Sequence, residues 1–155
     1  MKKVMFILSF VYVIAAYNVQ AQEINQNKRQ SIVVTEVLDG DTIDATLLEQ
    51  KKNVRIRLAD IDCPETSKKS GNFNKQIKDW NLSEDELKEK GREAKEKLSA
   101  LITLNEDNLY FEYTPKKICG NEKRKVGILW TGDGLNINEY MLQKAGCKPY
   151  SCANK

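Results

Sequence analysis

The stretch RLADIDCPET, residues 57–66, ends a predicted β-strand with a high density of charged side chains. Apolar residues alternate with Arg55 and Arg57 along this strand, so both arginines lie on the face opposite the apolar one. Asp62 and Glu65 follow, and the proline between them stops the strand. Carboxylates of this kind are the oxygen donors that calcium and magnesium prefer. The strand end is therefore a candidate metal or catalytic site.

A second acidic stretch, VLDGDTI at residues 37–43, contains an Asp-Gly pair that is typical of a hairpin turn. If the first and third strands lie side by side, the turn at Asp41 and the strand end at Asp62 converge. Taken singly, each acidic stretch is equally typical of a solvated turn. Arg57 alone would be a surface or salt-bridged residue.

The order of predicted elements favours a mainly β, α+β fold: a five-stranded OB-fold barrel with two packed helices. The expected strands are residues 31–38, 42–48, 54–61, 108–114 and 125–131, and the expected helices are 83–104 and 135–146. Ser83 and Glu86 form a capping-box pattern at the start of the longer helix. Residues 66–81 are expected to form a surface loop, and the tail from Cys147 shows no regular pattern. By pattern alone a generic α+β domain fits nearly as well.

The N-terminus has the features of an export signal. Lys2 and Lys3 precede an apolar run from Val4 to Ala16, and small residues at Val19 and Ala21 fit cleavage after residue 21. The run is shorter than the roughly 20 residues that a membrane span needs. We expect a signal peptide over 1–21, a flexible segment over 22–30 and one domain over 31–155, in a secreted or periplasmic protein.

Composition narrows the chemistry. The chain has no histidine, which excludes histidine-based nucleophilic catalysis and histidine-ligated zinc. Removing Lys2 and Lys3 with the signal lowers the net charge from +3 to +1, so a general polybasic field is absent. The four cysteines of an exported chain suggest disulfides, and the spacing favours Cys147–Cys152 with Cys63–Cys119, although buried free thiols are also compatible.

Together these motifs resemble the staphylococcal nuclease (thermonuclease) family over most of the predicted domain. VLDGDTI is similar to the first metal-binding turn of the family, and RLADIDCPE is similar to its strand-end signature. GREAKEKLSALI, KRKVGIL and LNINEYMLQKAG resemble, less specifically, its long helix, the strand of its second catalytic arginine and a later helix.

The resemblance implies a calcium-dependent endonuclease of thermonuclease type, a hydrolase that cleaves DNA and RNA phosphodiesters and leaves 3′-phosphates. Single-stranded nucleic acid would be the favoured substrate, and we expect a monomer. The resemblance assigns each predicted site residue a role. The calcium ligands would be the carboxylates of Asp41 and Asp62 and the backbone carbonyl of Cys63. Glu65 would be the general base, and Arg57 and Arg124 would stabilise the charge on the phosphate.

Two departures from the family pattern leave an alternative open. Asp60 stands where relatives have a small or apolar residue, and Glu122-Lys123 replaces a Tyr-Gly pair before Arg124. Glu122 could pair with Arg124 and draw it away from phosphate. The alternative is a catalytically weak or inactive OB-fold module that binds nucleic acid or a protein partner.

Overall fold

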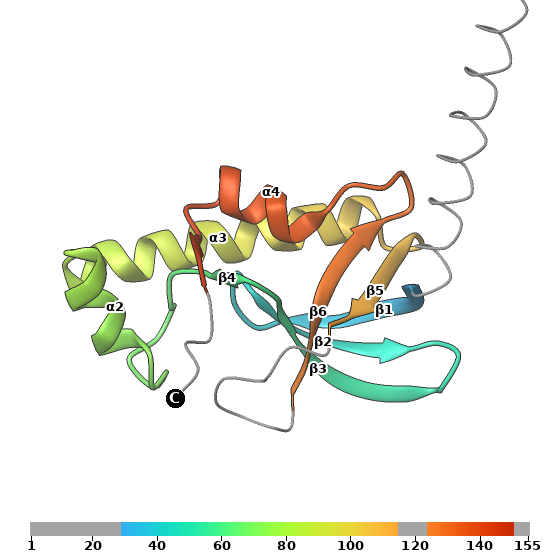
Figure 1. Ribbon diagram of the computed structural model, residues 1–155. Coiled ribbons are helices and arrows are strands. Elements are labelled where there is room, and N and C mark those ends of the chain that lie inside the picture. Colours follow the sequence, from blue (N-terminus) through green and yellow to red (C-terminus); the bar gives the residue numbers. More distant parts are fainter. Residues whose placement is uncertain (1–28, 115–123, 151–155) are drawn as a thin grey trace, which may run out of the picture.

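The computed structural model describes residues 29–114 and 124–150 (Figure 1). The predicted signal peptide over 1–21 lies outside the described residues, as do Cys119, Glu122 and Cys152. Within the described part of the chain, no helix combines the length and apolar character needed to cross a membrane.

Five strands close into a barrel in the order β1-β2-β3-β6-β5. They are β1 (Arg29–Val37), β2 (Thr42–Leu47), β3 (Lys52–Leu58), β5 (Leu109–Tyr113) and β6 (Arg124–Thr131). The β3–β6 pair is parallel and the other pairs are antiparallel, so the predicted five-stranded barrel is confirmed. The first and third strands do not lie side by side, because β2 lies between them. β1 begins at Arg29, so the last two residues of the predicted flexible segment belong to the barrel.

The predicted strand 54–61 is broken near its end. The chain turns at Ala59 and Asp60, where Asp60 adopts a φ of 62°, a left-handed conformation that aspartate tolerates. The short strand β4 (Ile61–Asp62) follows and pairs with β7 (Lys148–Pro149). The tail that was predicted to lack regular structure therefore contributes a strand beside the acidic strand end.

The two predicted helices are present and pack over one side of the barrel (Figure 1). α3 (Glu84–Leu104) begins with the predicted capping box, in which Ser83 and Glu86 bond reciprocally. α4 (Ile137–Lys144) is capped by the Asn136 side chain. The barrel and the two helices share one apolar core, whose fully buried members include Ile43, Ile56, Leu98, Leu129 and Met141.

A third helix, α2 (Phe73–Trp80), occupies the segment that was predicted to be a surface loop. Lysines and asparagines dominate this segment, but its apolar residues Phe73, Ile77 and Trp80 recur at helical spacing. Phe73 and Gln76 are both buried, so two side chains anchor the short helix. The predicted loop was wrong because these buried contacts outweigh an otherwise polar and exposed sequence.

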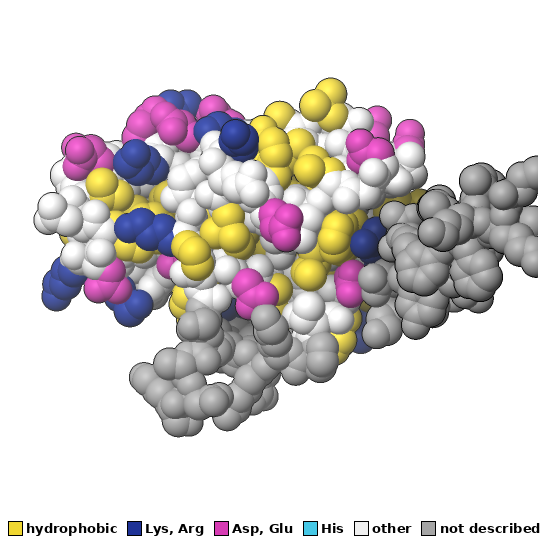
Figure 2. All heavy atoms as spheres, turned by 45° about the horizontal axis from the view of Figure 1, so that its top comes forward, with side chains coloured by type: hydrophobic (Ala, Val, Ile, Leu, Met, Phe, Trp, Pro, Cys, Tyr) yellow, Lys and Arg dark blue, Asp and Glu magenta, His cyan; other side chains and the backbone are white. Residues whose placement is uncertain are grey.

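Acidic and basic side chains are interspersed on the face shown in Figure 2. Along α3, ion pairs at helical spacing join charges of opposite sign, including Arg92 with Glu96 and Lys88 with Glu84. Such exposed pairs contribute little to stability, typically about 0–1 kcal/mol each. Because both signs of charge are interspersed, this face has no large patch of one charge.

Gly91 brings α3 into close contact with the segment after β4. A Cβ atom at this position would lie 2.8 Å from the backbone carbonyl oxygens of both Pro64 and Glu65. A glycine inside α3 is thus explained by close packing against the acidic segment.

Gly91→Ala is expected to destabilise the protein. Alanine favours helix over glycine by about 1 kcal/mol, but the clash with backbone requires α3 or the acidic segment to move, and overpacking typically costs about 1–3 kcal/mol. Urea denaturation would measure the difference, with Gly71→Ala as the control because a Cβ there meets nothing within 4 Å. A Gly91→Ala protein that is more stable than the original would contradict the packing account.

Candidate active site

All the predicted site residues except Cys63 line a single cleft of about 520 Å³. They are Asp41, Arg57, Asp62, Glu65 and Arg124. Cys63 is buried behind the cleft and is 3% exposed. Segments distant in the sequence therefore meet at one place, at the end of the barrel where β4 leaves it.

Strand register explains why these side chains converge. Thr42 pairs with Arg57 across the β2–β3 ladder, which puts the preceding residue, Asp41, next to the arginine. The parallel β3–β6 ladder pairs Arg55 with Arg124, two positions away from Arg57. Because strand residues two apart share a face, Arg124 reaches the same side of the barrel as Arg57.

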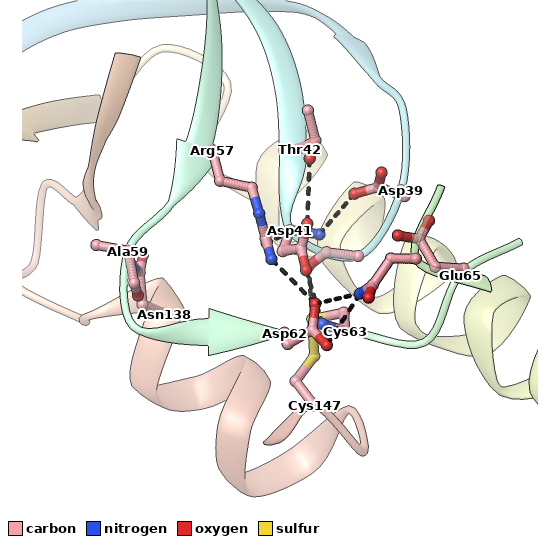
Figure 3. A network of polar contacts seen from close by, with 12 residues as sticks. Asp39, Asp41, Thr42, Arg57, Ala59, Asp62, Cys63, Glu65, Asn138 and Cys147 are labelled. Carbon is pink, nitrogen blue, oxygen red and sulfur yellow. Dashed lines mark hydrogen bonds and ion pairs between the residues drawn. A yellow bond between two sulfur atoms is a disulfide. The ribbon is translucent and has the colours of Figure 1, made fainter. Parts of the chain in front are cut away.

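Asp41 is almost completely buried and all its bonds are to protein groups (Figure 3). Its Oδ2 accepts a 2.6 Å hydrogen bond from the backbone N–H of Cys63, and its Oδ1 accepts one from the Thr42 hydroxyl. Burial raises the pKa of Asp41 well above its usual value, although the Arg57 guanidinium acts against the increase. Because burial disfavours the charged form of Asp41, that form needs a cation beside it.

Arg57 supplies that cation and connects two carboxylates. Its Nη1 pairs with Oδ1 of Asp41, and its Nη2 lies 3.1 Å from Oδ1 of Asp62 (Figure 3). Burial alone would lower the pKa of Arg57, but the neighbouring carboxylates outweigh it and the pKa is raised. The guanidinium fork therefore fixes the separation of Asp41 and Asp62.

Glu65 is half-buried at the edge of the cleft. Burial raises the pKa of its carboxyl above the usual 4.5, a hydrogen bond with Ser70 lowers it, and the charges of Asp39 and Asp62 raise it further. The net effect is an increase, which makes Glu65 a better proton acceptor than an ordinary surface carboxylate once it is ionised.

A disulfide joins Cys63 to Cys147, next to Asp62 and just before β7. This corrects the predicted pairing of Cys63 with Cys119 and of Cys147 with Cys152. Sequence proximity favoured the wrong pair, because the β4–β7 pairing that brings residues 84 positions apart together is not visible in the sequence.

Comparison with known proteins gives the same assignment as the motifs. The family model described as "Staphylococcal nuclease homologue" matches residues 55–153. The chain belongs to the staphylococcal nuclease family. It is also 26% identical over 121 residues to a protein of Escherichia coli O157:H7 named "Uncharacterized endonuclease". That match covers 78% of this chain and 61% of the relative, so the chain spans about three fifths of the relative's length.

Arg124 stands at the start of β6 and is partly buried. Within the part of the chain that the structure describes, its Nε is buried without a hydrogen-bond partner. A buried guanidinium nitrogen that lacks a partner favours an anion. Its neighbour Glu122, the residue predicted to compete for it, lies outside the described residues.

The donors around the cleft fit a hard cation by their chemistry. Asp41 and Asp62 are two carboxylates held by one guanidinium fork, and the Cys63 carbonyl adjoins Asp62 in sequence. Among the described residues, no cluster of three or more acidic, histidine or cysteine side chains forms a metal site.

Two amide side chains from α2 also belong to the site, and sequence reasoning missed both. Asn72 Nδ2 lies 3.2 Å from Asp62 Oδ1, and Gln76 Nε2 lies 2.9 Å from Asp62 Oδ2. Their spacing of four residues puts them on one face of a helix. A helical reading of the Phe73, Ile77 and Trp80 pattern would have revealed that face.

Glu65→Gln is expected to stabilise the metal-free protein at neutral pH. A raised pKa means that the folded state prefers the protonated carboxyl, so the contribution of Glu65 to stability is lost as pH rises through that pKa. Glutamine is neutral throughout, so the gain should be present at pH 7 and absent near pH 3. Urea denaturation at both pH values measures it, and Glu106→Gln at an exposed site is the control. An equal gain at both pH values would contradict the electrostatic explanation.

Cys147→Ser is expected to lower stability by about 4 kcal/mol, the loop-closure contribution for a loop of this length. The change also frees Cys63, whose N–H bonds to Asp41, so the site should loosen together with the fold. Thermal unfolding with and without reductant measures the effect. A protein whose midpoint does not change on reduction would show that the disulfide is dispensable.

Proposed function

We propose that this protein is an exported, calcium-dependent nuclease that hydrolyses phosphodiester bonds in DNA or RNA. The observation that carries the proposal is the single cleft into which Asp41, Arg57, Asp62, Glu65 and Arg124 all project. Membership of the staphylococcal nuclease family and a relative named as an endonuclease support it. We propose that the protein acts as a monomer and that single strands, which bend easily into a recessed cleft, are its favoured substrates.

In the proposed reaction, Glu65 takes a proton from a water molecule as the water oxygen attacks phosphorus. The bond between phosphorus and the 5′-oxygen of the next nucleotide breaks, which leaves a 3′-phosphate, and the departing oxygen takes up a proton. The raised pKa of Glu65 supports its role as base, because a base works best when its pKa is near the working pH.

Arg57 and Arg124 would stabilise the negative charge that develops on the phosphate oxygens. Preorganised cations of this kind typically change rates by 100-fold or more. Among the described residues, no group hydrogen-bonds to Arg124 Nε, which supports this role for Arg124. Arg57 is already engaged with Asp41 and Asp62, so we propose that it meets phosphate from a fixed position in the cleft.

Calcium would be held by the carboxylates of Asp41 and Asp62 and by the Cys63 carbonyl. When bound, it would add positive charge beside the scissile phosphate. The Cys63 carbonyl also accepts a 2.8 Å hydrogen bond from Gln76, and a carbonyl oxygen has a second lone pair for another partner.

Export is proposed from the basic and apolar N-terminus, with cleavage after residue 21. The Cys63–Cys147 disulfide supports it, because structural disulfides persist mainly in oxidising compartments outside the cytosol. Extracellular calcium would also suit a site with few carboxylates, whose affinity should be low.

The alternative is a module that binds nucleic acid without cleaving it. The observation that favours it is the engagement of both Arg57 arms with carboxylates, which leaves phosphate recognition to Arg124 and exposed lysines such as Lys75. A positioned, half-buried Glu65 favours the nuclease, because binding alone needs no base at that place.

The test is cleavage of denatured DNA and of RNA by the purified protein, in millimolar calcium and in excess chelator. Glu65→Ser should lower the rate by at least about 100-fold through loss of the base. Arg57→Lys keeps a positive charge between the two carboxylates but loses the fork, and should lower the rate to a similar degree. Arg55→Lys is the matched control and should retain activity, because Arg55 lies on β3 like Arg57 but is exposed and bonds to Asp44 of β2.

Calcium-dependent cleavage that both variants lose would establish the nuclease. Folded protein that binds nucleic acid in a gel-shift assay but never cleaves it would establish the binding module instead. Cleavage by Glu65→Ser at the original rate would refute the role of Glu65.

A further inference from the structure

Gln76 is a buried amide directly behind the cleft. It lies in the middle of α2 and is 1% exposed. Its Nε2 donates to Oδ2 of Asp62 at 2.9 Å and to the carbonyl oxygen of Cys63 at 2.8 Å. Its Oε1 accepts from the backbone N–H of Glu65 at 2.9 Å. One side chain therefore bonds to three of the four residues between Asp62 and Glu65.

The chemistry of these partners allows only one orientation of the amide. Two of the three partners are acceptors and the third is a donor, which matches the two ends of a glutamine side chain. A reversed amide would face the Asp62 carboxylate and the Cys63 carbonyl with an oxygen, and the Glu65 N–H with an NH₂ group. Every bond would then become a repulsion, so the site selects both the residue type and its rotamer.

Asn72 contributes a second, independent sign that α2 is built around this site. It is the N-cap of α2, a position where asparagine usually accepts a hydrogen bond from the first turn of its own helix. Its side chain makes no such capping bond and instead donates to both oxygens of Asp62, at 3.2 and 3.3 Å. The helix thus forgoes a stabilising cap and directs that amide toward the acidic strand end.

We propose that Gln76 is a positioning residue for the reaction: it fixes the Asp62 carboxylate and the backbone from which the Glu65 side chain projects. The catalytic meaning rests on the proposed function, but the hydrogen-bond arrangement can be tested without it. Residues that hold ligands and bases in place typically change affinity or activity by about 10- to 100-fold when they are removed.

The first measurement needs no catalysis. In the metal-free protein, exchange of the Glu65 backbone amide reports directly on its bond to Gln76. Gln76→Met keeps nearly the same volume but loses all three bonds, and should speed exchange at Glu65 by about tenfold while amides of β2 and β3 stay unchanged. Gln143→Met, at an exposed helical glutamine on α4, is the matched control.

The second measurement separates positioning from folding. Gln76→Met should lower kcat by about 10- to 100-fold with little change in KM, and calorimetry should show weaker calcium binding. Gln143→Met should leave kcat, KM and calcium binding as they are.

Each outcome is decisive. Faster exchange at Glu65 with a lower kcat supports the proposal, and unchanged exchange in folded Gln76→Met overturns it. If the original protein does not cleave nucleic acid, the proposed function fails, while exchange at Glu65 and calcium affinity still decide the positioning role. If Gln76→Met does not fold, hydrogen exchange of the Gln76 side-chain NH₂ in the original protein provides the test. Exchange as fast as that of the Gln143 side chain would overturn the proposal, and slower exchange would support it.

Discussion

The guanidinium of Arg57, held between two carboxylates, is the interaction on which the candidate site depends. Through Asp41 it ties β3 to the turn before β2, and through Asp62 it ties β3 to the short strand β4. All three side chains are largely buried, so none of them can lose its partner cheaply. Removing one member of a buried ion pair typically costs about 3–5 kcal/mol, because the remaining charge is left uncompensated. Electrostatic attraction therefore fixes how Asp41, Arg57 and Asp62 lie relative to one another in the cleft.

The same burial makes the ionised forms of the acidic groups energetically unfavourable. The pKa values of Asp41 and Glu65 are both raised, chiefly because burial disfavours their charged forms. A domain selected only for stability would put neutral side chains at these positions. Perturbed carboxyls that share one cleft with two arginines are typical of a functional site rather than of a structural ion pair.

Much of this arrangement could be predicted from the sequence, since local patterns carry it. The barrel strands follow from alternation, α3 follows from its capping box, and the charged strand end identifies the cleft. Three features were not predicted. The β4–β7 pairing and the Cys63–Cys147 disulfide depend on contacts between distant segments. The helix α2 has an apolar pattern at helical spacing, which its many polar residues obscure. The amides of Asn72 and Gln76 were not predicted as site residues, because only the folded structure shows that they bond to Asp62.

These unpredicted features act on the same short segment, residues 62–65. β4 has only two residues, and so small a strand has little stability of its own. The Gln76 amide of α2 forms hydrogen bonds with the segment. α3 packs closely against it where Gly91 contacts the backbone carbonyls of Pro64 and Glu65. The disulfide to Cys147 holds it from a third direction.

The three restraints are of different types: hydrogen bonds, close packing and a covalent bond. Together they restrain residues 62–65 from three sides, so the carboxyl groups of Asp62 and Glu65 are positioned with the precision that longer elements normally provide. These restraints lie outside the closed ladder of the barrel strands, yet they connect α2, α3 and the segment before β7 to one point beside the barrel, so the site and the fold are stabilised together.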